Sequence, residues 1–112
     1  MHYVPDRGHA VWLSFDPQVG HEHAGRRPAL VVSPASYNEK VGLALVCPIT
    51  SRVKGYPFEV EIPKESGVEG VVLSDQVKSL DWEKRKAAFI CQVPGRVTGE
   101  VLAKLRTLLD KE

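Results

Sequence analysis

Short apolar segments dominate the chain, and they predict a protein built mainly of β-strands. In segment 11–15 every second residue is apolar, which places Val11, Leu13 and Phe15 on one face of an extended strand. Other segments either alternate in the same way or are continuously apolar, as expected for central strands of a sheet. The six predicted strands are 11–15, 29–32, 43–46, 58–62, 71–74 and 87–93.

Glycine and proline separate these segments at nearly every gap. Examples are Asp16-Pro17, Gly55-Tyr56-Pro57 and Pro94-Gly95. Closely spaced short strands with turn residues between them are typical of a small barrel or sandwich, and not of a parallel sheet.

The clearest helix signal lies at the C-terminal end. An apolar stripe at helical spacing is formed by Val101, Leu102, Leu105, Leu108 and Leu109. We expect Thr98 to be the N-cap of this helix, and Val97 and Leu102 to form a hydrophobic staple across its first turn. The stripe can cover the barrel, form a subunit interface, or do both. Single helical turns are predicted at 35–40 and 81–85.

Length and charge limit the possible functions. With 112 residues, 43% of them apolar, the chain is expected to be one domain spanning 1–112. A domain this small is marginally stable alone, so a subunit interface would add stability. The net charge is only +1, so any RNA binding must come from a local basic patch and not from bulk attraction.

The cysteines and the hydropathy point to the cytoplasm. Cys47 and Cys91 lie far apart in apolar strand segments, and we expect reduced core thiols, not a disulfide or a metal pair. We also expect no secretory leader, because the N-terminus lacks a hydrophobic run behind a basic segment. No stretch approaches the ~20 apolar residues that span a bilayer.

The most informative segment is 20–34. It brings an acid, two imidazoles and two guanidiniums into a glycine-bounded loop that leads directly into a predicted strand; these are His21, Glu22, His23, Arg26 and Arg27. Polar groups on the rim of a rigid element are how catalytic sites are usually built. The spacing of the two histidines suggests a metal, but no third ligand is near, so no metal is predicted.

These segments together resemble the MazF/PemK (Kid) family of toxin endoribonucleases from type II toxin–antitoxin systems. The resemblance covers nearly the whole chain, and the order and spacing of its motifs make it specific. The motifs are Tyr3-Val-Pro-Asp6, Val11-Trp12, Phe15-Asp-Pro17, Glu22-x-Ala-Gly-x-Arg27-Pro-Ala29, Ser33-Pro34, Tyr37-Asn38, Lys54-Gly-Tyr-Pro-Phe-Glu-Val60, Asp75-Gln-Val-Lys-Ser79 and Trp82.

The resemblance implies a fold, an activity and partners. Members are homodimeric SH3-like barrels of the CcdB/PemK type. They cut single-stranded RNA, in particular mRNA, at short motifs without a metal or cofactor, and a cognate MazE-like antitoxin neutralises them. The implied catalytic residues are Arg27, Thr50 and Glu22. Asp75 matches an aspartate used in some members, but the arginine that those members place two residues earlier is Leu73 here, so a role for Asp75 stays open.

The chemistry of these side chains suits metal-free RNA cleavage. Attack of a 2′-hydroxyl on the adjacent phosphate needs a base, a cation for the phosphorane and a donor for the leaving 5′ oxygen. The planar fork of Arg27 matches phosphate oxygens, and Thr50 can donate a hydrogen bond to one. Glu22 is the best local candidate for the base, and His21 or His23 could be acid or base.

RNA binding should fall to basic and aromatic side chains near these residues. The candidate set is His21, His23, Arg26, Ser51, Arg52, Lys54, Tyr56 and Lys78. Arginine and lysine would follow the phosphates, and Tyr56 or Phe15 could stack on bases, although Phe15 also fits a core position. Segment 51–57 is either a mobile flap over RNA or an ordinary solvated loop.

Each of the predicted catalytic residues also has a purely structural interpretation. Arg27 could pair with a carboxylate, Thr50 could be an ordinary strand residue, and Glu22 could be a solvated charge. One alternative function is a non-enzymatic toxin of the same fold that poisons DNA gyrase, but those relatives end in Trp-Gly-Ile and this chain ends in Asp110-Lys-Glu112. Another alternative is an inactive RNA-binding or antitoxin-binding module, which the intact set of Glu22, Arg27 and Thr50 disfavours.

Overall fold

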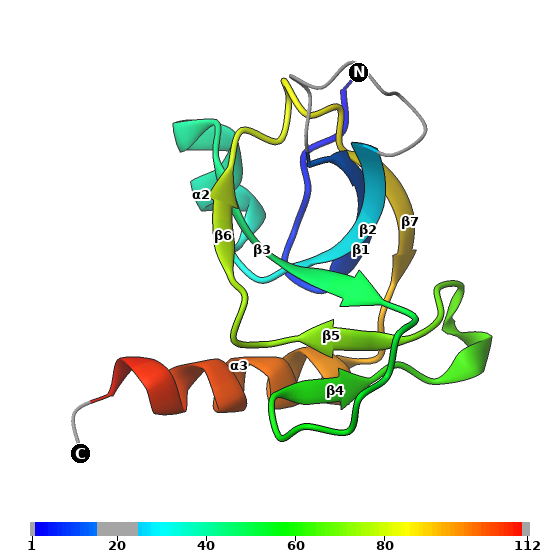
Figure 1. Cartoon of the computed structure of the whole chain (residues 1–112). Coiled ribbons are helices and arrows are strands. Elements are labelled where there is room, and N and C mark those ends of the chain that lie inside the picture. Colours follow the sequence, from blue (N-terminus) through cyan, green and yellow to red (C-terminus); the bar gives the residue numbers. More distant parts are fainter. Residues whose placement is uncertain (1, 16–24, 111–112) are drawn as a thin grey trace.

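The computed structural model describes residues 2–15 and 25–110. Within these ranges the chain forms one antiparallel sheet of seven strands, two α-helices and a 3-10 helix (Figure 1). The strands are β1 (His9–Ser14), β2 (Arg26–Val31), β3 (Ala44–Thr50), β4 (Glu59–Glu61), β5 (Val71–Leu73), β6 (Lys78–Leu80) and β7 (Ala88–Gln92). The helices are α2 (Ala35–Val41), η1 (Lys64–Ser66) and α3 (Gly95–Leu109). Figure 1 shows α3 running alongside β4 and β5, away from α2.

Strand β3 pairs with different strands along its length and connects the two parts of the sheet. The strand order is β4-β5-β3-β2-β1-β7, and β6 pairs with β3 beside this path. The first half of β3 pairs with β6 over residues 44–46, whereas its last two residues, Ile49 and Thr50, pair with β5. Pro48 lies between these halves and lacks an N–H group, so it fits a strand that changes neighbours at this point. One strand thus joins two parts of a small barrel.

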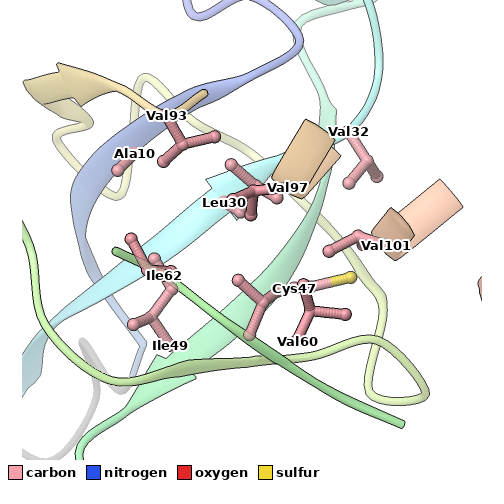
Figure 2. Packing of buried hydrophobic residues seen from close by; sticks show 11 residues of the cluster. Ala10, Leu30, Val32, Cys47, Ile49, Val60, Ile62, Val93, Val97 and Val101 are labelled. Carbon is pink, nitrogen blue, oxygen red and sulfur yellow. The ribbon is translucent and has the colours of Figure 1, made fainter. Parts of the chain in front are cut away.

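Side chains on both faces of the β1-β2-β3 sheet are buried. The residues facing α3 form one core cluster, in which Val97 and Val101 of the helix contact strand residues (Figure 2). The strand members of this cluster include Ala10, Leu30, Cys47, Ile49, Val60 and Val72. The opposite face carries a second cluster, formed by Val11, Leu13, Ala29, Val31, Ala44, Val46 and Trp82. Burial on both faces explains why 29–32 and 43–46 are continuously apolar.

Asn38 of α2 connects this helix to the N-terminal segment and to the turn around Trp82 by hydrogen bonds. The residue is fully buried, and its side-chain Nδ2 donates to the carbonyls of Pro5 (2.8 Å) and Ser33 (3.0 Å). Its own carbonyl accepts the indole N–H of Trp82 at 2.9 Å. Since buried amide groups must be hydrogen-bonded to be tolerated, this position requires an asparagine or a close equivalent.

A residue distant in sequence caps helix α2. Asp6 Oδ1 accepts the backbone N–H of Ala35, the first residue of the helix, at 2.8 Å, and also that of Arg7 at 2.8 Å. The bond from Ala35 is the main reason that the pKa of Asp6 is lowered, against the opposing effect of partial burial. A carboxylate at a helix N-terminus satisfies a free donor and interacts favourably with the helix dipole.

We expect Asp6→Asn to destabilise the protein by about 0.5–1 kcal/mol at neutral pH, because the oxygen remains while the charge is lost. A lowered folded-state pKa means that the carboxylate stabilises the fold above its ordinary pKa of about 3.9 and loses this effect as pH falls through the folded value. Urea unfolding of both proteins should therefore give a constant difference between about pH 5 and 8 that shrinks below about pH 4. A difference that grows on acidification would contradict this, and Glu39→Gln on the exposed side of α2 is the control.

All six predicted strands are present, and the predicted mainly β barrel with a C-terminal helix is confirmed. The sequence did not predict β6, and segment 82–86 forms hydrogen-bonded turns instead of a helix. The expected N-cap was wrong. Helix α3 begins at Gly95 after Pro94, and Thr98 is buried inside the helix. With no cap at Thr98, the Val97–Leu102 staple does not exist either.

The apolar stripe of α3 divides into two parts. Val101 and Leu105 are buried against the barrel and Leu102 is half-buried, which confirms that the stripe covers the core. Leu108 and Leu109 are 52% and 74% exposed, so the end of the helix is left available to a subunit interface.

Cys47 and Cys91 are free thiols, as expected. Burial raises the pKa of Cys47 to about 12, and partial burial raises the pKa of Cys91. Neither thiol is therefore suited to nucleophilic chemistry near neutral pH.

The helices in the part of the chain that the structure describes are all too short or too polar to cross a membrane.

Candidate active site

The site lies where the pairing of β2 with β3 ends. The register runs from Val31 opposite Val46 to Ala29 opposite Pro48, and the same register would place Arg27 opposite Thr50. The ladder stops before that pair, although each of the two residues is paired on its other edge, Arg27 with Leu13 of β1 and Thr50 with Val71 of β5. Residues opposite one another in a ladder share a face of the sheet, so both side chains lie on one side of the opening.

Arg27 and Thr50 line the same cavity at this opening. Its volume is about 300 Å³, and Arg27 is exposed while Thr50 is half-buried. The other lining residues are Phe15, Pro48, Ile49, Leu73, Gln76 and Lys78. An arginine and a hydroxyl that share a cavity with an aromatic ring and a lysine suit a ligand with a phosphate and a base.

The hydroxyl of Thr50 is held by its own backbone. Its Oγ1 accepts the N–H of Arg52 at 3.1 Å, the pattern of a threonine turn. This bond uses an acceptor lone pair of the hydroxyl and leaves its proton free to be donated. The arrangement fixes the side chain while keeping a donor available in the cavity.

Gly70 keeps the backbone of Thr50 in place. Gly70 has φ +118°, and a Cβ at this position would overlap the carbonyl oxygen of Thr50. Only glycine combines that backbone conformation with so close an approach. The strand end that carries Thr50 is therefore packed tightly against the start of β5.

A second cavity continues from the first across the loop after β3. It has a volume of about 140 Å³ and shares Thr50, Leu73 and Gln76 with the first. The residues that it adds are Arg52, Lys54, Tyr56 and Glu59. The two hollows together form a groove with Thr50 near its middle and basic side chains at both ends.

Tyr56 and Asp75 connect the two loops that border the groove. The Tyr56 hydroxyl donates to Asp75 Oδ1 at 2.8 Å, and this bond is the main reason that the pKa of Tyr56 is raised. Asp75 is thereby bonded to the phenol, and it is absent from the lining of the cavity that holds Arg27. Leu73 does line both hollows, so this chain presents an aliphatic side chain where the resemblance leads one to expect an arginine.

Lys78 and Phe15 form the other end of the groove. The Lys78 ammonium lies 5.7 Å from the centre of the Phe15 ring, within the range of a cation–π interaction. Phe15 is also packed against the second core cluster, which agrees with both interpretations of this residue.

Arg26 and Ser51, also predicted to bind RNA, do not line either of these two hollows. Arg26 Nη1 donates to the carbonyls of Lys86 (2.9 Å) and Arg85 (3.3 Å), so one arm of the guanidinium fastens β2 to the neighbouring turn. Ser51 lines a third hollow, of about 490 Å³, which contains neither Arg27 nor Thr50 but shares Tyr56 and Glu59 with the second hollow.

Three predicted residues, His21, Glu22 and His23, belong to segment 16–24, outside the described residues. In the described ranges, no group of three or more histidine, cysteine, aspartate or glutamate side chains could hold a metal ion.

Gln76 is a site residue that was not predicted from the sequence. Its exposed amide lines both hollows beside Thr50 and can donate as well as accept hydrogen bonds. The signal in the sequence was its place in the motif Asp75-Gln-Val-Lys-Ser79.

A small antiparallel β-barrel with a C-terminal helix, and with arginine, lysine and threonine side chains around one cavity, has a fold of SH3-like type. The comparisons specify the family. The sequence profile of the "PemK-like, MazF-like toxin of type II toxin-antitoxin system" matches residues 6–109, and the chain belongs to this family.

Individual relatives support the assignment along nearly the whole chain. The endoribonuclease toxin MazF of Escherichia coli K12 is 45% identical over 107 residues, which are 96% of each chain. The crystal structure of MazF from Deinococcus radiodurans (Form-I) is 58% identical, covers 96% of this chain and 98% of its own, and has a TM-score of 0.87. A MazE–MazF crystal structure from the same organism (Form-II) is 54% identical, covers 96% and 97%, and also has a TM-score of 0.87.

Proposed function

We propose that this protein is a MazF-type endoribonuclease toxin that cuts single-stranded RNA, in particular mRNA, at a short motif without a metal. The observation that carries the proposal is the presence of Arg27 and Thr50 in one cavity, at the rim of a groove with basic side chains. Relatives at 45% and 35% identity are named endoribonucleases, which favours an enzyme over a gyrase-poisoning toxin of the same fold.

The reaction is an internal transfer of the phosphate. The 2′ oxygen forms a bond to phosphorus, the bond from phosphorus to the 5′ oxygen breaks, and the products are a 2′,3′-cyclic phosphate and a 5′-hydroxyl. The proton of the 2′-hydroxyl passes to a base, and the departing 5′ oxygen takes up a proton from a donor. The protein must also stabilise the negative charge that gathers on the phosphorane.

Arg27 and Thr50 supply that stabilisation. Two N–H groups of the exposed Arg27 guanidinium can bind two non-bridging oxygens at once. The Thr50 hydroxyl, oriented by its bond from Arg52 N–H, donates to the phosphate from the facing strand end. Groups fixed before the substrate arrives need little reorganisation during the reaction, which is why this arrangement lowers the barrier.

Glu22 is our candidate for the base, and His21 or His23 for the donor to the leaving oxygen. All three belong to the segment that joins β1 to β2, whose two ends meet where Phe15 N–H donates to Gly25 O at 2.8 Å. The RNA backbone would be bound by Lys78 at one end of the groove and by Arg52 and Lys54 at the other, with Tyr56 and Phe15 next to bases.

The proposed partners follow from the family. MazE–MazF crystal structures exist for the Deinococcus radiodurans relative. We infer that a MazE-like antitoxin occludes the groove of this chain with an acidic and apolar segment that neutralises Arg27 and the basic loop. We further propose a homodimer, to which the exposed Leu108 and Leu109 contribute, a single domain over 1–112, and a cytoplasmic location.

The direct test is to incubate the purified protein with a long RNA in excess chelator and to map the new ends. The proposal expects cuts at a recurring short motif with 2′,3′-cyclic phosphate and 5′-hydroxyl ends. RNA that stays intact would contradict the assignment as an enzyme. Cleavage that requires an added divalent metal would contradict the metal-free mechanism.

A further inference from the structure

We propose that Glu59 is a positioning residue that holds the β3–β4 loop, residues 51–58, in the conformation that binds RNA. The hydrogen bonds that support this inference do not depend on the proposed function, whereas the expected effect on RNA binding rests on it. In the sequence, Glu59 is part of the predicted strand 58–62, where alternation places its carboxylate on the polar face together with Glu61. In the structure Glu59 is half-buried at the start of β4 and lines the same hollow as Thr50, Arg52 and Lys54.

The carboxylate of Glu59 binds two successive backbone N–H groups. Oε2 accepts the N–H of Lys54 at 2.9 Å, and Oε1 accepts the N–H of Gly55 at 2.8 Å. Two adjacent N–H groups that converge on one anion form a nest, a geometry that proteins commonly use for phosphate. Here a side chain of the same protein occupies the nest and closes the loop onto its own following strand.

Gly55 supplies the backbone conformation that the nest requires. Its φ is +85°, in the left-handed region that favours glycine, and no heavy atom lies within 4 Å of where a Cβ would stand. The glycine is therefore needed for its backbone angle and not for space. The pair of Gly55 and Glu59 thus forms one local device within the motif from Lys54 to Val60.

Two further bonds fasten the same loop at other points. The Tyr56 hydroxyl donates to Asp75 at 2.8 Å, and Lys104 Nζ of α3 donates to the carbonyl of Pro57 at 2.6 Å. Among these three anchors, Glu59 is the one that binds the backbone of Lys54 itself, together with that of Gly55. These interactions favour a preorganised loop over a mobile flap.

The consequence concerns RNA affinity more than the chemical step. Arg52 and Lys54 contact the groove beside Thr50, whereas Arg27 is on a separate strand that the loop does not position. We call the two hydrogen bonds from the N–H groups of Lys54 and Gly55 to Glu59 the clamp. Loss of the clamp should let the side chains of Arg52 and Lys54 leave the groove, so that RNA binds less tightly before and during the reaction. A change of that kind raises KM and leaves kcat nearly unchanged.

The test compares Glu59→Gln with Glu61→Gln. Glu61 lies two residues further along β4, and it has no hydrogen bond to the loop among the described residues, so it is a matched control. Glutamine keeps the size of the side chain, but its NH₂ group cannot accept an N–H. We expect E59Q to raise KM for RNA about tenfold and change kcat less than about threefold, while E61Q matches the wild type. Amide exchange of Lys54 and Gly55 should accelerate at least about tenfold in E59Q only.

A second pair of variants separates loop geometry from general destabilisation. Gly42 at the end of α2 has φ +83° and equally open space, so Gly42→Ala carries the same backbone strain away from the groove. We expect Gly55→Ala to raise KM as E59Q does, and Gly42→Ala to lower stability without this effect.

The outcomes distinguish the clamp from the activity. Unchanged exchange at Lys54 and Gly55 in E59Q, or unchanged KM in both E59Q and Gly55→Ala, would overturn the clamp even if the wild type cleaves RNA. Tighter RNA binding by E59Q would also overturn it, because Glu59 would then compete with phosphate for the nest. If the wild type does not cleave RNA, the proposed function fails, and amide exchange still decides whether Glu59 holds the loop.

Discussion

Replacing Arg27 with alanine is expected to reduce RNA cleavage by at least about a hundredfold, because removing one well-placed donor from a developing oxyanion costs about 3 kcal/mol in barrier. The side chain is exposed and makes no hydrogen bond within the described part of the chain, so its loss should leave the fold unchanged. The measurement is the single-turnover cleavage rate of one RNA, together with the thermal midpoint of each protein.

The control for this variant is Arg96→Ala. Arg96 is an exposed arginine in the first turn of α3, outside the groove, so this change removes the same charge from the protein without touching the site. Both variants should unfold near the wild-type temperature. A fully active Arg27→Ala protein, or equal loss of activity in the two variants, would refute the role of Arg27.

Replacing Asn38 with alanine should have the largest effect on stability. The change leaves the carbonyls of Pro5 and Ser33 without their shared donor and opens a small cavity in the interior. Unsatisfied buried groups and cavities each cost on the order of 1–3 kcal/mol, so we expect a loss of about 3 kcal/mol. For a domain of this size that corresponds to a thermal midpoint lower by roughly 10–20 °C.

Glu39→Ala is the control for Asn38, since Glu39 is the next residue of α2 and is exposed. It should change the midpoint by no more than a few degrees, because exposed substitutions alter stability by about 0.5 kcal/mol or less. Both proteins must be compared at one concentration, as association stabilises a dimer by mass action. A midpoint for Asn38→Ala close to the wild type would show that the network around Asn38 contributes little.

The sequence predicted those features of the fold that arise from local patterns. Alternation and continuous apolar runs identified six strands. A strand buried on one face alternates apolar and polar residues, and a strand buried on both faces is continuously apolar. Strand β6 was not predicted, because Lys78-Ser-Leu80 is short and mostly exposed, and its pairing with β3 depends on the tertiary fold. The N-cap of α3 was misplaced because Thr98 is a typical cap residue, whereas Pro94 starts this helix without any side-chain cap.

The site was only partly predictable for a different physical reason. Arg27 and Thr50 were named from a resemblance, but nothing local shows that they share a cavity, because this depends on where the β2–β3 register ends. The same applies to Gln76 and Glu59, whose positions follow from pairing over a distance. Arg26 was predicted to bind RNA, yet alternation along β2 directs it toward the turn at Arg85 and Lys86.

The end of a ladder is a suitable place for this chemistry. Arg27 and Thr50 are fixed by pairing with Leu13 and Val71, but they are not paired with each other, and both line one cavity. Thr50 gains further rigidity from its pairing with Val71 and from the close approach of Gly70. A site on strand ends is more precise than one on loops alone, and preorganisation of this kind supports electrostatic catalysis.

The most direct test of the account is a double-mutant cycle between Arg27→Lys and Thr50→Val, measured as single-turnover cleavage of one RNA in chelator. If both side chains act on the same phosphate, their losses are not independent. The double variant should then be slower than the worse single variant by less than about threefold. A rate reduced by the full product of the two single effects would contradict the claim that Arg27 and Thr50 work together.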